Sequence, residues 1–135
     1  MSVHKSKREE SSMQFLDNAL ELHTFTLKQC LKFPKRYTFV ISNGLIELSR
    51  ECFRNAKAGN SIVPTNKHEV QMRRDYFLKA NACVMNMYTE LDIAINTITG
   101  IEEKNIIKWV GMMHEEERLL KGIMKSDKER FKNFK

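Results

Sequence analysis

The residues with the clearest potential for catalytic or metal chemistry form a short run, His114-Glu115-Glu116-Glu117. A zinc-hydrolase motif needs a second histidine four residues after the first, and a di-iron site in a helical bundle needs Glu-x-x-His on two helices plus two further glutamates. Neither pattern is present. We interpret the run as an exposed acidic helix face, with the alternative that Glu117, which falls on the inner row, pairs with a buried cation or lies at an interface.

Other catalytic residue types lack suitable neighbours. His23 falls on an apolar stripe, and the sequence places no acid or cysteine beside it, so we interpret it as a core or interface histidine. Cys30, Cys52 and Cys83 form no CxxC pair and lie on or beside apolar stripes, which indicates small buried hydrophobic residues in a reducing cytosol. The glycines are scattered singly, and no GxSxG motif is present. We therefore expect no enzyme, no metal and no cofactor, although sites assembled across helices escape this kind of search.

Cationic side chains are the remaining chemical signal. The formal net charge is +6 and the pI is about 9.3. Such a balance favours anionic partners, nucleic acid first, because lysine and arginine neutralise phosphates without reading sequence. The alternative is a solvated surface whose lysines complement helix C-termini. The predicted nucleic-acid-binding residues are Lys28, Lys32, Lys35, Arg36, Lys67, Arg73, Arg74, Lys125, Lys128, Arg130 and Lys132.

Both ends of the chain are basic. Residues 1–10, with Lys5, Lys7 and Arg8, are predicted to form a flexible basic arm, and residues 126–135 a basic C-terminal tail. Phe131 and Phe134 lie among the cations of that tail. Aromatic rings in such a setting stack on bases or dock on a partner protein.

The element that organises the chain is a long helix predicted over residues 66–98. Asn66 followed by Glu69 is typical of an N-cap with its reciprocal acid. Apolar residues then recur at alternating steps of three and four, which places them on one helix face. This ridge consists of Phe77, Ala80, Val84, Met87, Leu91, Ala94 and Ile98.

Three further helices are predicted around it. The first runs from Ser11 to about Lys32 and has the inner stripe Met13, Leu16, Leu20, His23, Leu27 and Cys30, with Leu31 beside it. The second starts near Pro34 and ends before Gly59, with the inner stripe Thr38, Ile41, Leu45, Leu48 and Cys52. The fourth follows Thr99-Gly100, where Thr99 and Glu102 are expected to form a cap, and continues to about residue 125. Ile106, Val110, Met113, Leu120 and Met124 form one row of this helix, and Trp109, Leu119 and Ile123 form another.

Four helices with short connections predict an all-α fold, an antiparallel up-down-up-down four-helix bundle over residues 11–125. We expect the Lys28–Arg36 cluster to share one end of the bundle with the tail, and the N-terminal arm to share the other end with the start of the third helix. Gly111 and Gly122 predict the close approach of another helix, within the bundle or in a second subunit. The charged N-terminus resembles no signal peptide and no apolar run is long enough for a membrane span, which predicts a cytoplasmic protein without a membrane partner.

Several segments resemble a known family. They are Lys32-Phe33-Pro34-Lys35-Arg36-Tyr37-Thr38-Phe39, Ile62-Val63-Pro64-Thr65-Asn66, Arg73-Arg74-Asp75-Tyr76-Phe77-Leu78-Lys79-Ala80 and Met124-Lys125-Ser126-Asp127-Lys128-Glu129-Arg130. Together these segments resemble the accessory variability proteins (Avd) of diversity-generating retroelements. A broader relative is the bundle protein encoded within intervening sequences of bacterial ribosomal RNA genes. The resemblance spans nearly the whole chain, but its motifs are turn and packing residues.

The resemblance implies a non-catalytic accessory protein that binds the element's reverse transcriptase and its RNA, and with it cDNA, to support mutagenic reverse transcription. It also implies a ring-like homopentamer with a basic surface. Of the candidate residues, only Pro34, Lys35, Arg36, Arg73 and Arg74 match family positions. The alternative is a structural or protein-interaction bundle with no nucleic-acid role, of the ribosomal intervening-sequence type.

Overall fold

The computed structural model describes the backbone of residues 7–135 and the side chains of residues 13–135. Over this range the chain is all-α and contains no strand. The four α-helices are α1 (Lys7–Cys30), α2 (Asn43–Ser61), α3 (Lys67–Thr97) and α4 (Glu103–Arg130). A 3₁₀ turn, Lys35–Tyr37, and a π-helical turn, Thr38–Ser42, lead into α2.

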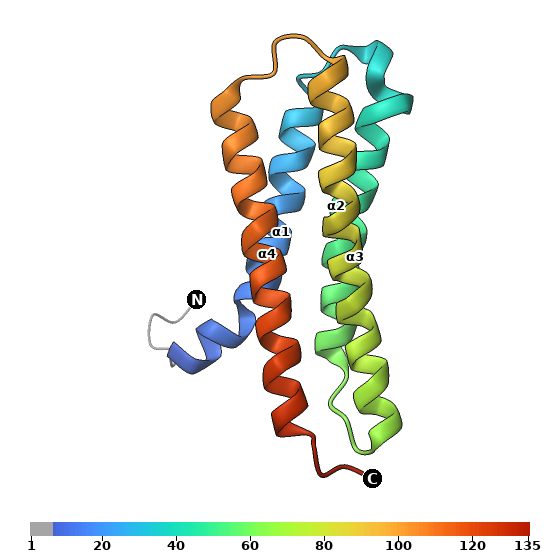
Figure 1. Ribbon diagram of the computed structural model, residues 1–135, viewed down its shortest axis with the longest axis vertical. Coiled ribbons are helices and arrows are strands. Elements are labelled where there is room, and N and C mark those ends of the chain that lie inside the picture. The colour runs from blue at the N-terminus through green and yellow to red at the C-terminus, as the bar shows by residue number, and fades with distance from the viewer. Residues whose placement is uncertain (1–6) are drawn as a thin grey trace.

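The helices lie lengthwise beside one another (Figure 1). α1 packs against α2 and α4, and α3 packs against the same two helices. Figure 1 shows the α1–α2 and α3–α4 connections at one end and the α2–α3 link at the other, together with the C-terminus. The core fills the space between the helices, where the rings of Phe15 and Phe77 meet edge to face with centroids 5.5 Å apart.

Helix α3 confirms the prediction made for it. Every residue of the predicted ridge from Phe77 to Ile98 is buried. The Asn66 side chain accepts a 2.9 Å hydrogen bond from the Glu69 backbone N–H, so Asn66 is the N-cap. The Glu69 carboxylate accepts from the backbone N–H and hydroxyl of Thr65, at 2.7 and 2.5 Å. The reciprocal half of the cap therefore involves the residue before Asn66.

α1 begins earlier and α4 ends later than the sequence predicted. α1 already includes Lys7, and residues 1–6 of the predicted arm, with Lys5, lie outside the described residues. α4 continues through Arg130 and so includes half of the segment predicted as a tail. The N-cap predicted for α4 from Thr99 and Glu102 is wrong, because Glu102 caps that helix without a side-chain hydrogen bond.

The buried face of α1 differs from the predicted stripe. Phe15, Ala19 and Leu22 are buried, whereas Met13, Leu20 and Leu31 are exposed. The buried row continues to Thr26, a polar residue, because its hydroxyl donates to the Leu22 carbonyl at 2.7 Å and accepts from the Trp109 indole at 3.0 Å. A pattern that counts only apolar residues assigns threonine to the surface. The predicted buried face of α1 is therefore rotated about the helix axis relative to the observed one.

Gly59 does not end α2 as predicted; the helix continues to Ser61. Gly59 is buried, and a Cβ atom at this position would lie 2.6 Å from the Phe77 ring. The absence of a side chain therefore allows α2 and α3 to approach closely. By contrast, a Cβ at Gly111 or Gly122 of α4 meets no atom of the described residues within 4 Å. The close approach predicted at these glycines is therefore not made by another helix within the described part of the chain.

Two glycine substitutions should have opposite effects on stability. Gly59→Ala is expected to lower the free energy of unfolding by about 1–3 kcal/mol, because the methyl group overpacks the contact with Phe77. Gly122→Ala is expected to raise it by about 1 kcal/mol, because alanine is the better helix former and the space is open. Urea unfolding measured by circular dichroism checks both changes. An unchanged midpoint for Gly59→Ala contradicts the described packing of α2 on α3.

Among the described residues, no helix combines the length and the apolar character needed to cross a bilayer.

Candidate nucleic-acid interface

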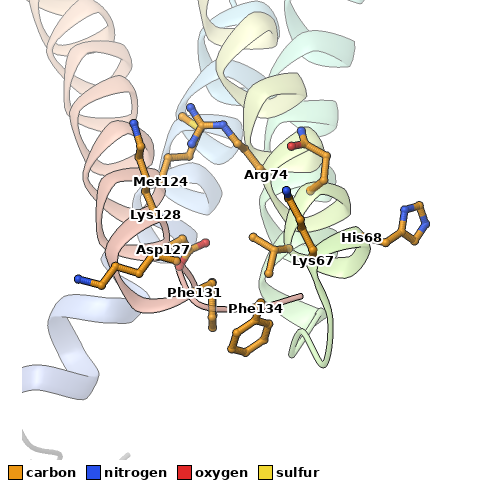
Figure 2. A pocket seen from close by; sticks show the side chains of 11 residues that line it. Lys67, His68, Arg74, Met124, Asp127, Lys128, Phe131 and Phe134 are labelled. Carbon is orange, nitrogen blue, oxygen red and sulfur yellow. The ribbon is translucent and has the colours of Figure 1, made fainter.

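A groove of about 780 Å³ lies between the first turns of α3 and the last turns of α4 (Figure 2). Figure 2 shows Met124, Asp127 and Lys128 on the α4 side, Lys67 and Arg74 on the α3 side, and the rings of Phe131 and Phe134 toward its lower edge. The full lining is Lys67, His68, Val70, Gln71, Arg74, Met124, Asp127, Lys128, Phe131, Lys132 and Phe134. Basic and apolar side chains from two distant segments therefore meet here.

A buried ion pair joins the two helices beside the groove. The Arg73 guanidinium donates to both carboxylate oxygens of Asp127, at 2.6 and 3.3 Å. It also donates to the backbone carbonyls of Gly59 and Ile62, at 3.3 and 3.1 Å. One side chain thus joins α3 to α4 and to the end of α2. Arg73 is only 6% exposed, and its charge is neutralised by Asp127 inside the fold. The prediction that Arg73 contacts nucleic acid is corrected for this reason.

The segment after α4 folds back across the start of α3. The Phe134 N–H donates to the Phe131 carbonyl at 3.2 Å, and the Lys67 N–H donates to the backbone oxygen of Lys135 at 3.0 Å. The rings of Phe131 and Phe134 lie 5.2 Å apart, centroid to centroid. The predicted tail is therefore an ordered wall of the groove from residue 131 onward.

The electrostatic balance of the groove is positive. Lys67, Arg74 and Lys128 are exposed cations, and among the described side chains no ion pair involves them. Lys132 pairs with Glu129 at 2.6 Å on the surface, an interaction that solvent and salt weaken. Asp127, the one acid among the described lining residues, is neutralised by Arg73 and by Arg130 at 3.0 Å. An anion entering the groove therefore meets cations from both sides.

The remaining predicted contacts do not all lie here. Lys125 is exposed on α4 outside the groove lining, and Arg130 is held toward Asp127. Lys28, Lys32, Lys35 and Arg36 are exposed at the opposite end of the molecule. There, Lys32, Phe33 and Pro34 line a smaller cavity together with residues 98–102 of the α3–α4 connection and Asn105 of α4.

The expectation that the Lys28–Arg36 cluster shares an end with the C-terminal tail is therefore wrong. α1 ends where α4 begins, so the end of α4 lies at the far end of the molecule, beside the start of α3 (Figure 1). The structure creates two separate basic regions. Of these two regions, the one between α3 and α4 is a groove in which several cations and two aromatic rings lie together.

The acidic run on α4 is divided between surface and core. Glu115 is paired with Arg118 on the surface. Glu117 is half-buried; it accepts from Lys121 at 2.9 Å and from the Tyr88 hydroxyl at 3.3 Å. Glu116, not Glu117, occupies the inner row and is fully buried. Burial raises the pKa of Glu116 to about 8, although a 3.1 Å hydrogen bond from Asn18 acts in the opposite direction.

His23 does have a polar partner, Ser49 of α2, with its Nδ1 atom 2.7 Å from the Ser49 hydroxyl. Burial, together with the nearby Arg50, lowers the pKa of His23. Ser49 is completely buried and donates to the Ile46 carbonyl at 3.0 Å, so the imidazole donates to the serine and cannot activate it as a nucleophile. This pair links α1 to α2.

Among the side chains that the structure describes, no three His, Cys, Asp or Glu residues gather as a metal site would require. The three cysteines are free; Cys30 and Cys52 are buried, as predicted, and Cys83 is half-buried. Burial raises the pKa of the Cys30 thiol to about 12, which keeps it unreactive at neutral pH.

The sequence search missed Val70, Gln71, Met124 and Asp127 as lining residues. Asp127 had a readable signal. It falls three residues after Met124 on the buried row of α4, while Arg73 falls four residues before Phe77 on the buried row of α3. One acid and one base on facing apolar rows indicate a buried ion pair.

Comparison of the chain with models of protein families, with curated proteins and with solved structures found no match.

Proposed function

We propose that this chain is a non-catalytic nucleic-acid-binding protein, and that RNA binds in the groove between α3 and α4. The observation that carries the proposal is the gathering of Lys67, Arg74, Lys128 and Lys132 around the rings of Phe131 and Phe134. Cations on both sides suit a polyanion, because each neutralised phosphate releases a condensed counterion. The described lining residues include no nucleophile with an activating base, so binding is the chemistry that they support.

We further propose the specific role implied by the sequence resemblance, an accessory protein of a diversity-generating retroelement. In this role it binds the element's reverse transcriptase together with its RNA and cDNA in the cytoplasm, without catalysis of its own. The positions of the motif residues are compatible with this role. Phe33 of the first motif packs near Trp109, with centroids 6.3 Å apart, and Arg73 and Phe77 of the third motif are buried. These motif residues pack inside the fold and determine its shape. The exposed cations beside them are available to bind partners.

We propose that the architecture is the antiparallel up-down-up-down four-helix bundle, in which each helix packs against its two neighbours. Oligomer formation, as a pentamer by resemblance, belongs to the same proposal. Its support is the outer face of α3, where Leu78, Met85 and Ile93 are exposed at intervals of seven and eight residues. Apolar side chains repeated along one helix face are typical of protein contacts. The same face suits the alternative of a bundle that binds only proteins.

The first test of the groove is a charge reversal on its α3 side. Arg74→Glu is expected to weaken the binding of a 12-nucleotide unstructured RNA about tenfold at about 0.1 M salt, because a phosphate contact is replaced by repulsion. Arg54→Glu is the matched control; Arg54 is exposed on α2, away from the groove, and the variant changes net charge equally. Fluorescence anisotropy measures both affinities. Equal losses in the two variants contradict a localised site, and no binding by the unmodified protein contradicts the proposed function.

The salt dependence of the same binding provides a second measurement. If Lys67, Arg74, Lys128 and Lys132 each neutralise one phosphate of a single strand, the slope of log K against log salt is about −3. The affinity then falls roughly 50-fold between about 50 and 200 mM salt. A slope near zero contradicts phosphate binding.

A further inference from the structure

The groove contains a feature that phosphate binding alone does not require, an aromatic wall. Phe131 and Phe134 line it beside Val70 and Met124, between the cations of the two helices. Cations suffice to hold a polyanion of any kind, whereas apolar rings in the same opening add a surface for a flat, weakly hydrated group. This inference rests on the proposed nucleic-acid binding and concerns which form of nucleic acid is bound.

The two rings are held in different ways. Phe131 is restrained by guanidinium groups, with Arg130 and Arg73 at 4.7 and 6.0 Å from its centroid. Phe134 packs against Phe131 at 5.2 Å, and backbone hydrogen bonds at Phe134 and Lys135 hold this segment against α4 and α3. Phe131 thus supports the aromatic wall. No guanidinium among the described side chains covers Phe134, so Phe134 is the ring available to a ligand.

We propose that the groove selects single-stranded nucleic acid, with a base stacked on Phe134 and the adjoining phosphates bound by Lys67 and Arg74 on one side and Lys128 on the other. Aromatic stacking requires an accessible base face, which a single strand offers and a duplex hides within its own stack. A duplex reaches the cations with its phosphates but leaves Phe134 without a partner. Stacking is indifferent to base identity, so the selection concerns strandedness and not sequence.

The size of the groove agrees with this assignment. Its volume of about 780 Å³ lies within the range of roughly 300–1,000 Å³ typical of sites for small ligands. A short stretch of single strand fits such a space. The lining combines these cations with the apolar residues Val70, Met124 and Phe134, which matches a chain with charged phosphates and flat bases.

The experiment compares three labelled probes by anisotropy: an unstructured 12-nucleotide RNA, the same RNA in a duplex, and single-stranded DNA of the same sequence. The unmodified protein is expected to bind the single-stranded RNA at least tenfold more tightly than the duplex. Phe134→Ala should weaken single-strand binding roughly five- to a hundredfold, the range of one lost stacking contact, and should change duplex binding less than twofold. Phe134→Tyr should keep the affinity, because it keeps the ring.

The matched control is Phe39→Ala, since Phe39 is 87% exposed in the π-helical turn, outside the groove lining. It should change no affinity. Single-stranded DNA should bind within about threefold of RNA and lose affinity equally in Phe134→Ala. Binding of RNA but not DNA overturns the proposal, because stacking alone does not detect the 2′-hydroxyl group.

A spectroscopic variant tests whether the alanine substitution acts only by disturbing the structure. In Phe134→Trp the new indole should be quenched by the single-stranded probes and not by the duplex, while the native Trp109 is fully buried and gives a constant background. Equal affinity for duplex and single strand, or unchanged fluorescence on saturation with RNA, overturns this inference while leaving the proposed function in place. Absence of binding to every probe overturns both.

Discussion

Replacing Asp127 with asparagine is expected to lower the free energy of unfolding by about 3–5 kcal/mol, the loss typical when one partner of a buried ion pair is removed. The Arg73 guanidinium would stay buried among the carbonyls of Gly59 and Ile62 with its full charge no longer compensated. Arg73→Met should cost a similar amount, because it leaves the Asp127 carboxylate with the more exposed Arg130 alone. Urea unfolding followed by circular dichroism measures both effects.

Two companion variants make this prediction specific. Glu51→Gln breaks an exposed pair with Arg54 and should leave stability nearly unchanged. The double variant Arg73→Met/Asp127→Leu should recover much of the loss, because an apolar pair of similar size needs no charge compensation. If Asp127→Asn is as stable as the parent protein, the ion pair does not hold α3 to α4, and the groove lacks the support described for it.

The second large effect concerns pH and Glu116. This carboxyl group is fully buried; one of its oxygens accepts from Asn18, and the other has no hydrogen-bond partner among the described residues. Its pKa is about 8 in the folded protein, raised first by burial and also by the neighbouring Glu115, against an ordinary value of 4.5. The folded state therefore binds a proton that the unfolded state releases between these two pH values. Stability is complete below the lower pH and is lost as the pH rises through the upper one.

The expected size of this loss is about 3–5 kcal/mol between roughly pH 4.5 and pH 8. Glu116→Gln, which resembles the protonated acid, should remove this dependence and stabilise the protein at pH 8. Glu117→Gln is the control one residue away; it loses a surface pair with Lys121 and should keep the slope. Chemical unfolding at a series of pH values checks this. A parent protein and Glu116→Gln variant with the same pH profile contradict a buried neutral carboxyl.

The fold could be predicted from the sequence where apolar spacing and burial coincide. In α3 the apolar ridge is buried along its whole length, so the pattern predicted the correct face. In α1 and α4 polar residues lie inside: Thr26 is satisfied by Leu22 and Trp109, and one oxygen of Glu116 accepts from Asn18. No periodicity of apolar residues detects a polar group whose partner comes from another helix. The role of Gly59 also depends on another helix. Its sequence context predicts a helix end, whereas in the structure it leaves space for Phe77 of α3.

The candidate site could be predicted only as a set of charges. The sequence identified Lys67, Arg74, Lys128 and Lys132 as cations, and it identified the aromatic tail. It did not predict that these two segments meet, because this depends on which helix ends lie together. Arg73 was grouped with Arg74 because adjacent basic residues look alike in a sequence. They lie on different sides of the helix, and Arg73 is buried against Asp127 while Arg74 lines the groove.

The most direct test is photocrosslinking of an RNA containing 4-thiouridine to the unmodified protein, followed by mass spectrometry of the modified peptides. The proposed site predicts adducts on the segment around Phe131 and Phe134 and on the start of α3 from Lys67 to Arg74, all of which should decrease with added salt. Adducts confined to the Lys28–Arg36 cluster at the other end of the molecule, or no adducts at saturating RNA, would contradict binding in the groove between α3 and α4.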